Sequence, residues 1–244
     1  MKLSVVIPCL NESDTIAECV GAARRTIKAL GIEGEVVVAD NGSADRSQEL
    51  ASAAGARVVQ IEARGYGSAL DGGIRASTGA FIIMGDADGS YDFRQIPLFL
   101  AKLREGHDLV MGCRMPSGGG TMEPGAMPFL HRWLGNPMFS LMTRWWFGVP
   151  IHDVNCGMRG FTRDVYRRLE PQASGMSFAA EMVIKASLLG ASIVEVPIAF
   201  QRDGRKHSPP HLKTFRDGWQ VLWMLMTFAF RKARPRPASV QSSG

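Results

Sequence analysis

The sequence has few cysteines and lacks the motifs of several common classes of protein. Its four cysteines stand far apart, with no CxxC pair and no histidine-rich neighbour. A structural zinc site and a disulfide framework are therefore not expected, and reduced thiols in a cytosolic compartment fit the pattern. No GxGxxG or GxxxxGK(S/T) loop follows the first apolar segment, which excludes the common dinucleotide and Walker-type phosphate loops.

Long hydrophobic runs are also lacking. Met1-Lys2 leads directly into a β-branched segment that is too short for a signal peptide, and we expect it to form a first strand. As a helix, the apolar residues 219–230 would span only about 18 Å, against roughly 30 Å of bilayer hydrocarbon. This segment could lie in the membrane interface with the basic residues after it on anionic headgroups, or it could pack as a buried helix.

Charge is distributed unevenly along the chain. The formal net charge is +5, yet residues 202–236 hold nine Lys and Arg against two Asp, so the remainder is slightly negative. A basic segment of this kind favours an anionic partner near the C-terminal end. Nucleic acid is disfavoured because aromatic residues are not interleaved with the basic ones in a recognisable module.

Short β-branched runs alternate with segments of helical periodicity, which favours βαβ units and a mainly parallel sheet in one α/β domain. Strands are expected at 3–8, 36–40, 58–61, 81–85, 109–113 and 193–200, and helices at 16–30, 47–54, 68–76, 95–105 and 178–189. The Gly- and Pro-rich residues 115–125 are expected to form a flexible loop that packs as no regular element. Residues 129–147, with three Trp and three Phe, would make an apolar wall or an interfacial helix.

Polar residues follow three of the expected strands: 8–12, 40–43 and 85–89. Ligands of parallel α/β sheets bind beyond the carboxyl ends of the strands, so these residues are candidates for a site. Asp86 and Asp88 suit Mg²⁺ or Mn²⁺, since such cations prefer oxygen ligands and keep positions open for phosphate. Alone, this pair could equally be a polar turn, and its combination with the other strand ends favours a site.

The chain resembles the family 2 glycosyltransferases, and within them the polyprenol-phosphate sugar synthases of the dolichyl-phosphate mannose or glucose synthase type. The resemblance covers roughly residues 3–219 and is carried by VVIPCLNE, VVVADNGSADRS, GYGSALDGGIRASTGAFIIMGDADGSYDF, DLVMGCR, CGMRGF and FAAEMVIKA. It implies a GT-A fold, which we expect in residues 1–212. An amphipathic, interfacial helix is expected at 213–232 and a disordered basic tail at 233–244.

The resemblance also implies roles for individual residues. Contacts to the nucleotide are implied for Pro8, Leu10, Glu12, Asp40, Asn41, Gly67, Asp86 and Ala87. Asp86 and Asp88 would bind the metal, with Ser90 standing where the family commonly has a glutamine ligand. Catalytic roles are implied for Asp88, Arg114, Asp153 and Arg202, the last as a mobile clamp over the diphosphate. Acceptor contacts are implied for Arg114, Arg132, Asn136, Arg159 and Lys206.

The implied reaction is the transfer of a hexose, with inversion, from a UDP- or GDP-linked sugar to a polyprenyl phosphate, with Mg²⁺ or Mn²⁺ as cofactor. The protein would act peripherally on the cytoplasmic face of a membrane. Two alternatives stay open. The first is a family 2 enzyme that acts on a hydroxyl acceptor, which would need a general base, for which Asp153 and Glu181 are candidates. The second is an inactive nucleotide-binding scaffold, which the intact Asp86 and Asp88 disfavour. The base, the sugar, the lipid length and the oligomeric state are open.

Overall fold

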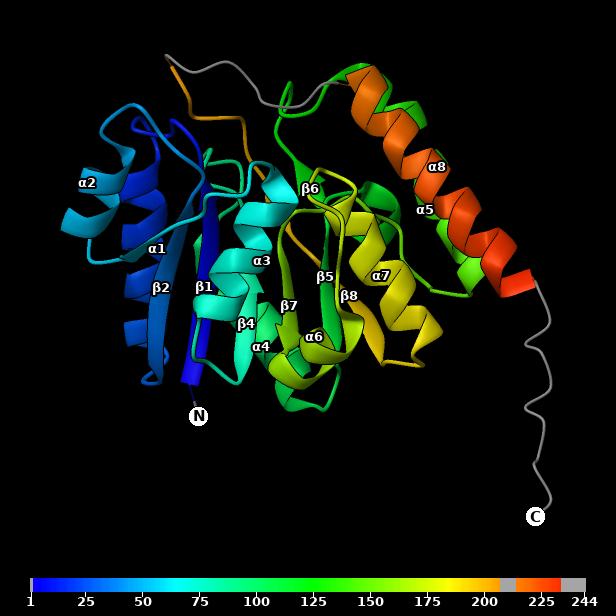
Figure 1. Cartoon of the computed structure of the whole chain (residues 1–244), viewed down its shortest axis with the longest axis horizontal. Helices are drawn as coiled ribbons and strands as arrows, with labels where there is room; N and C mark the ends of the chain where they lie inside the picture. The colour runs from blue at the N-terminus through cyan, green and yellow to red at the C-terminus, as the bar shows by residue number, and fades with distance from the viewer. Residues whose placement is uncertain (1, 207–213, 234–244) are drawn as a thin grey trace.

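The computed structural model describes residues 2–206 and 214–233, with side chains in the last helix described for residues 218–230. Its centre is a seven-stranded sheet in the order β3-β2-β1-β4-β7-β5-β8 (Figure 1). The strands are β1 (Lys2–Cys9), β2 (Glu33–Asp40), β3 (Arg57–Gln60), β4 (Phe81–Met84), β5 (Leu109–Cys113), β7 (Arg159–Thr162) and β8 (Ile193–Pro197). The expected strands are confirmed to within a few residues.

The sheet is mainly parallel, as the alternation of strands and helices predicts. One strand departs from this pattern: β7 runs antiparallel to both of its neighbours, β4 and β5. The pairs β1 with β2, β1 with β4, β2 with β3 and β5 with β8 are all parallel. The parallel strands therefore bring their carboxyl ends to one edge of the sheet.

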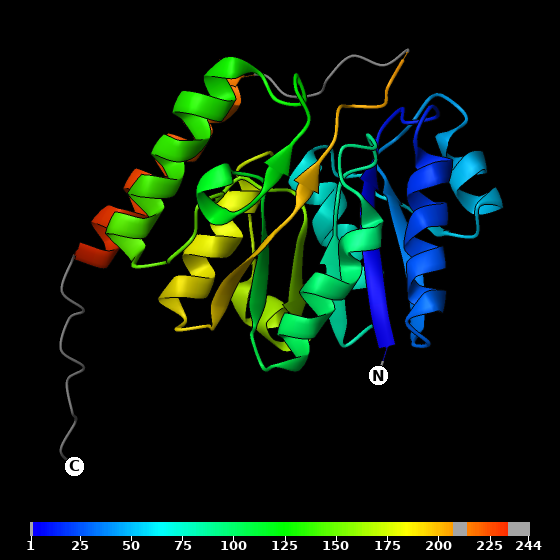
Figure 2. The ribbon, with the colours of Figure 1, turned by 180° about the vertical axis from the view of Figure 1, so that it is seen from behind.

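Helices cover both faces of the sheet. The face seen in Figure 2 carries α1 (Ile16–Ala29) and α4 (Ile96–Arg104), and the opposite face carries α3 (Tyr66–Ala76), α6 (Arg163–Leu169) and α7 (Phe178–Leu188). Val5 and Ile7 of β1 pack in the core on the α1 side, whereas Val6 between them packs on the α3 side. This alternation is expected of a strand with both faces buried. The remaining helix of the first half, α2 (Ser47–Ala53), follows β2.

The expectation that residues 115–125 pack as no regular element is wrong. The short strand β6 (Thr121–Met122) pairs with β9 (Ala199–Phe200) in a second, two-stranded sheet. Backbone hydrogen bonds hold the segment, from the Thr121 amide to the Ile198 carbonyl (3.0 Å) and from the Glu123 amide to the Phe200 carbonyl (2.9 Å). The expected strand at 193–200 is accordingly divided between two sheets.

Two further helices lie side by side beyond α7 (Figures 1 and 2). The first is one π-helical turn, η3 (His131–Gly135), continued by α5 (Asn136–Phe147), and the second is α8 (Thr214–Ala233). No helix in the part of the chain that the structure describes is both long and apolar enough to cross a bilayer. The tail expected at 233–244 lies, after Ala233, outside the described residues.

Candidate active site at the carboxyl ends of the strands

Acidic residues from three strand ends meet at one edge of the sheet. Asp40 ends β2, Glu12 follows β1, and Asp86 and Asp88 follow β4. The parallel register of β1 with both β2 and β4 brings these strand ends together. Burial raises the pKa of Glu12, and the charges of Asp88 and Asp86 raise it further, so these carboxylates act on one another. The structure therefore assembles the carboxylates that the sequence predicts.

Asp86 is held between a phenol and a glycine. The Tyr66 hydroxyl at the start of α3 donates to Asp86 Oδ1 at 2.8 Å. On the other side, a Cβ atom on Gly157 would lie 2.7 Å from Asp86 Oδ2, so only glycine fits there without a shift. Burial, followed by the charge of Asp88, raises the pKa of Asp86 above its ordinary value. Two carboxylates that repel each other in this way form a site that favours a cation.

Asp88 is oriented by its own turn. The Ser90 amide (2.9 Å) and hydroxyl (2.5 Å) both donate to Asp88 Oδ1. The second oxygen, Oδ2, faces the Arg205 guanidinium at 3.5 Å. The Ser90 hydroxyl thus supports Asp88 in this arrangement, and its role as a metal ligand stays a prediction.

The residues fit a divalent ion that is completed by its ligand. No group of three or more His, Cys, Asp or Glu side chains that could hold a metal exists among residues 2–206 and 218–230. Asp86 and Asp88 alone would supply the protein ligands, and Asp88 already faces a cationic group. Mg²⁺ is commonly bound by one or two carboxylates together with water and substrate phosphates. The oxygen donors present match that pattern.

Asp40 and Asn41 stand at the end of β2, on the same edge of the sheet as this pair. Asp40 Oδ2 accepts from the Gly42 and Ser43 amides and from the Gln48 side chain. Its other oxygen, Oδ1, is buried and has no hydrogen-bond partner in the structure. Such a buried acceptor is costly unless a ligand or water supplies a donor. Asn41 instead uses its amide within the protein, bonding the Ile61 and Ala63 carbonyls and the Gly65 amide.

The basic loop after β9 enters the site through a different arginine from the one expected. Arg202 is exposed and points away, donating to the Pro124 carbonyl at 2.6 Å while its amide donates to Glu123. Arg205 lies inward, with 8 % of its side chain exposed, and pairs with Glu12 at 3.2 Å. The amide of Lys206 donates to Asp14. The clamp role assigned to Arg202 stays a prediction that this conformation does not display.

Arg114 and Asp153 form a buried ion pair next to the carboxylates. Two guanidinium nitrogens of Arg114 contact the two Asp153 oxygens at 2.7 and 2.8 Å, and Asp153 is fully buried. A third Arg114 nitrogen donates to the Tyr91 hydroxyl at 3.3 Å, and the guanidinium lies 5.0 Å from the centre of the Phe200 ring. The bidentate geometry fixes the orientation of both side chains.

A second basic group lies on η3. Arg132 places its guanidinium 5.3 Å from the centre of the Trp133 ring, and its buried Nε has no hydrogen-bond partner in the structure. Burial and the nearby charge of Arg114 lower the pKa of His131. Asn136, at the start of α5, accepts a hydrogen bond from Asn155 at 3.0 Å. The predicted acceptor residues Arg132 and Asn136 thus lie on one helix that reaches the Arg114 side of the site.

Some predicted residues support the site from within the protein. Arg159 is fully buried and donates to the carbonyls of Ala179, Val154 and Cys156. Gly67 packs against the 173–175 backbone, and its amide donates to Ser174. Pro8 and Ala87 are buried and Leu10 is half-buried at the strand ends. Direct ligand contacts of these residues stay predictions.

Three side chains in the site were missed by sequence reasoning: Tyr66, Tyr91 and Arg205. Tyr66 stands in the GYG part of a segment that carries the family resemblance, but a role was implied there only for Gly67. The Tyr91 hydroxyl accepts from the Gly157 amide (2.7 Å) and from Arg114, so it links the β4 loop to the Arg114 pair. The position of Tyr91, three residues after Asp88, could have been a signal, but the direction of its side chain depends on the fold.

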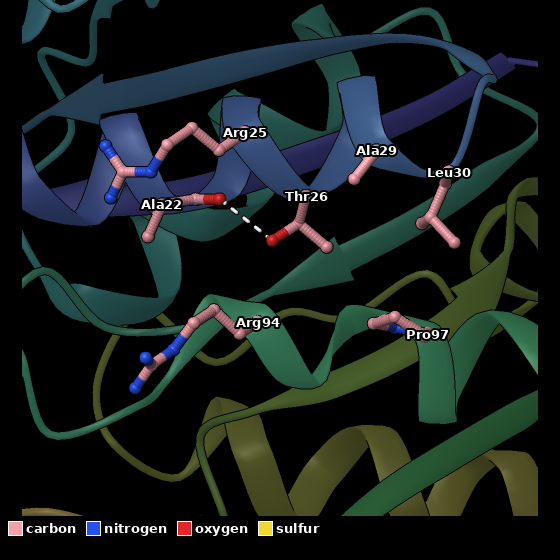
Figure 3. Close-up of a pocket in the computed structure, with 7 residues that line it drawn as sticks. All are labelled: Ala22, Arg25, Thr26, Ala29, Leu30, Arg94 and Pro97. Atoms are coloured by element: carbon pink, nitrogen blue, oxygen red, sulfur yellow. Dashed lines mark hydrogen bonds between the residues drawn. The ribbon is translucent and has the colours of Figure 1, made fainter.

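Two hollows elsewhere hold none of these groups. One, of about 350 Å³, lies between α1 and α4 and is lined by Ala22, Arg25, Thr26, Ala29, Leu30, Arg94 and Pro97 (Figure 3). It contains no carboxylate. The other, of about 690 Å³, lies between α7 and α8 and includes Glu181 and Trp223. The strand-end cluster is therefore the candidate site on chemical grounds.

Comparison with known proteins assigns this arrangement to one family. The model of the family described as glycosyl transferase family 2 matches residues 4–170. The low-salt glycan biosynthesis hexosyltransferase Agl6 of Haloferax volcanii is 39 % identical over 92 % of this chain, and this chain spans only 53 % of that relative's length. The dolichyl-phosphate hexose transferase of the same organism is 33 % identical over 82 % of each chain.

Solved structures share the fold. The glucosyl-3-phosphoglycerate synthase of Mycobacterium tuberculosis, in complex with Mn²⁺, UDP and glucosyl-3-phosphoglycerate, superposes with a TM-score of 0.71 at 24 % identity. The match covers 94 % of this chain and 80 % of that one. The architecture is the expected GT-A fold, with a mainly parallel central sheet flanked by helices.

Proposed function

Because this chain belongs to glycosyl transferase family 2, we propose that it transfers a hexose from a nucleoside-diphosphate sugar to a polyprenyl phosphate. The donor carries UDP or GDP, and the acceptor is the phosphate of a dolichyl-type lipid. The dolichyl-phosphate hexose transferase that resembles this chain over most of both lengths supports this acceptor. The protein's own side chains supply a further argument.

The observation that carries the proposal is that both carboxylates considered as general bases are engaged by other groups of the protein. The candidate bases are Asp153 and Glu181. Asp153 is neutralised by Arg114 in a bidentate pair. Glu181 accepts the backbone amides of Gln172 and Ala173 and pairs with Lys185 at 2.8 Å. A hydroxyl acceptor needs a base to take its proton, whereas a phosphate is already anionic at neutral pH.

Cationic groups are present where an anionic acceptor would need them. Arg132 has a buried Nε without a partner, and it lies on the helix that reaches the Arg114 side of the site. Two negatively charged phosphates that approach each other require such groups to reduce their repulsion. We assign binding of the acceptor phosphate to Arg132 and Asn136. Arg114, oriented by Asp153, would lie between the acceptor phosphate and the donor diphosphate.

In the proposed reaction a phosphate oxygen of the acceptor bonds to the anomeric carbon. The bond from that carbon to the diphosphate oxygen breaks, and the diphosphate leaves with the electron pair. No proton moves at the acceptor, and the single displacement inverts the configuration. A divalent ion held by Asp86 and Asp88 would neutralise charge on the diphosphate. Asp40 Oδ1, a buried acceptor without a partner, suits a hydroxyl of the nucleoside.

A lipid acceptor implies a membrane surface, and an exposed apolar face on η3, α5 and α8 supports one. Of fourteen exposed large hydrophobic side chains in the described residues, eleven belong to this two-helix face. They are Phe129, Leu130, Trp133, Leu134, Met138, Leu141, Trp145, Trp219, Trp223, Met226 and Phe230. Patches of this extent on a folded protein mark interaction sites.

The charges around the two-helix face fit an anionic bilayer. No Asp or Glu stands between residues 124 and 152 or between 218 and 233, and the same segments contain Arg132, Arg144, Arg231 and Lys232. Amphipathic helices with aromatic residues on one face and basic residues beside it bind in the headgroup region without crossing the bilayer. We therefore propose peripheral binding on the cytoplasmic face, where anionic lipids are enriched.

Mass spectrometry of products tests the function. The protein is incubated with UDP- and GDP-hexoses, a short polyprenyl phosphate and Mn²⁺, and parallel reactions contain soluble sugars in place of the lipid. A polyprenyl-phosphate hexose is the expected product. Transfer to sugar hydroxyls alone would establish the alternative acceptor class. If the protein neither transfers the hexose nor hydrolyses the donor, the result would support an inactive scaffold.

A further inference from the structure

Arg205 stands at the centre of an acidic cluster in the proposed donor site. Its guanidinium contacts Glu12 Oε1 at 3.2 Å and Asp88 Oδ2 at 3.5 Å. It also contacts both oxygens of Asp203, with Nε at 2.9 Å from each. Only 8 % of the side chain is exposed. One arginine therefore joins the carboxylate proposed for the metal to the carboxylate proposed for the nucleoside.

The loop that carries Arg205 is fixed beside β4. The Gln201 amide donates to the Ser90 carbonyl at 2.9 Å, and the Gly204 amide donates to the Asp88 carbonyl at 2.8 Å. A Cβ atom on Gly204 would lie 3.0 Å from the Thr15 side chain and 3.4 Å from the Asp88 carbonyl oxygen, so the backbone approaches closely there. Lys206 continues this contact through its amide, which donates to Asp14 at 2.8 Å. These bonds hold the guanidinium over Asp88.

A divalent ion at Asp88 has to compete with this arrangement. Asp88 Oδ1 accepts two hydrogen bonds from Ser90, and Oδ2 faces Arg205. A cation bound to Oδ2 would be repelled by a guanidinium at the same oxygen. The two cations cannot share this position, so one has to leave when the other arrives.

We propose that Arg205 is a tethered cation that occupies the metal side of the donor site and is displaced when a divalent ion binds, which makes it a determinant of metal affinity. The inference rests on the proposed function for the identity of the metal site. It assigns Arg205 a role different from that implied for Arg202, which contacts the 123–125 segment and neither Asp88 nor Glu12.

Displacement of Arg205 would free one end of the loop and leave the other end attached. Arg202 ties the loop to Glu123 and Pro124, a few residues before the η3 helix that carries Arg132. When Arg205 leaves Asp88, the bonds from Gly204 and Lys206 to the β4 and β1 loops no longer have the ion pairs of Arg205 beside them. The loop is then released on the donor side while it stays attached on the acceptor side.

Binding of Mn²⁺ alone, followed by electron paramagnetic resonance of the free ion, tests the inference. Arg205→Gln removes the competing charge and should lower the Kd for Mn²⁺ about fivefold or more, above the range of an exposed ion pair, because only 8 % of the Arg205 side chain is exposed. Arg205→Lys keeps the charge and should give a Kd closer to the native value than that of Arg205→Gln, although an ammonium cannot make every contact of the guanidinium. Arg25→Gln is the matched control, since Arg25 pairs with exposed Glu18 on the outer side of α1. It should leave the Kd unchanged.

Three results would overturn the inference. The first is that Arg205→Gln binds Mn²⁺ no more tightly than the native protein does, or does not bind it at all. The second is an equal gain in Mn²⁺ affinity in Arg25→Gln, and the third is a gain in Mn²⁺ affinity that survives the added change Asp88→Asn. Hydrogen exchange of the native protein gives a readout that needs no variant. Mn²⁺ should speed exchange of the Gly204 and Lys206 amides, and unchanged or slower exchange contradicts displacement. Neither measurement uses a sugar nucleotide or a lipid, so a missing transfer product would refute the proposed function and leave this inference standing.

Discussion

The Asp88 carboxylate is held in one orientation, because Ser90 donates two hydrogen bonds to one of its oxygens and the other oxygen points into the site. Asp88→Asn keeps the size of the side chain and removes its charge. We expect turnover to fall at least about a hundredfold, the scale of losing charge stabilisation at a reacting centre. The measurement is the initial rate of hexose transfer in excess Mn²⁺.

The control for this variant is Asp92→Asn. Asp92 lies in the same loop and pairs with exposed Arg94 at the surface. Its loss should leave the rate within about twofold of the native value, as for most exposed ion pairs. A near-native rate for Asp88→Asn would contradict the metal assignment.

The Arg114–Asp153 pair predicts a stability effect as well as an activity effect. Asp153→Asn leaves a buried guanidinium without its counter-charge, and we expect the free energy of unfolding to fall by about 3 to 5 kcal/mol. Equilibrium unfolding in urea measures the loss. The double variant Arg114→Met with Asp153→Leu removes both charges and should recover much of the stability without activity. An equally unstable double variant would show that packing, and not the unpaired charge, sets the cost.

Sequence reasoning identified the carboxylates of the site because their position follows from the strand pattern. It named Arg202 as the cation of the basic loop and gave no role to Arg205, three residues further on, which contacts Glu12 and Asp88 in the structure. The inward direction of Arg205 depends on the Gly204 amide bonding the Asp88 carbonyl. Arg159 presents a similar limit: its charge was visible in the sequence, but its complete burial against three carbonyls was not.

At the scale of secondary-structure elements, Glu35 joins four parts of the sheet. It lies in β2 and accepts hydrogen bonds from Ser4 of β1, Arg57 of β3 and Thr78 before β4. Burial acts to raise the pKa of Glu35, but the hydrogen bonds from Thr78, Arg57 and Ser4 outweigh it and lower the pKa to about 2.

This pKa predicts a pH-dependent contribution. Since the folded-state pKa lies below the ordinary 4.5, the stabilisation is fully present above about pH 4.5 and is lost as the pH falls toward 2. After allowance for solvent screening, we expect Glu35→Gln to cost about 1 to 2 kcal/mol at pH 7 and little near pH 2. Urea unfolding of both proteins across this range measures the difference. A cost that does not change with pH would contradict the argument.

The elements that the sequence predicts best are those with regular periodicity. The first five strands and the helices between them follow from alternating β-branched runs and apolar residues at helical spacing. The strand β6 was missed because Thr121 and Met122 stand among glycines and prolines, and only the partner strand β9, far along the chain, makes them a strand. The antiparallel direction of β7 was also not predictable, since local sequence does not specify the direction of pairing.

At the scale of the whole molecule, the two-helix face predicts how the protein meets a bilayer. Replacement of Trp145 and Trp223 by serine removes one large aromatic side chain from each helix, exposed by 82 % and 64 %. We expect affinity for phosphatidylglycerol vesicles to fall about tenfold or more, because each buried aromatic contributes more than 1 kcal/mol. Vesicle cosedimentation measures it.

Leu98→Ser provides the control for this variant, since Leu98 is also exposed (44 %) but lies on α4. It should bind vesicles as the native protein does. Equal binding by the tryptophan variant would exclude this face as the membrane contact. If the native protein changes its molecular mass with concentration and the tryptophan variant does so differently, the face would instead be assigned to contact with a second copy of the chain.

The antiparallel strand β7 also constrains how the chain is made. Residues 159–162 pair with β4 on one side and β5 on the other, so the two parts of the sheet are joined only after this late segment exists. Until it leaves the ribosome, β4 offers an open edge to other chains. A nascent protein that stalls before residue 159 is therefore a substrate for chaperones, and its aggregation should exceed that of one that stalls after β7.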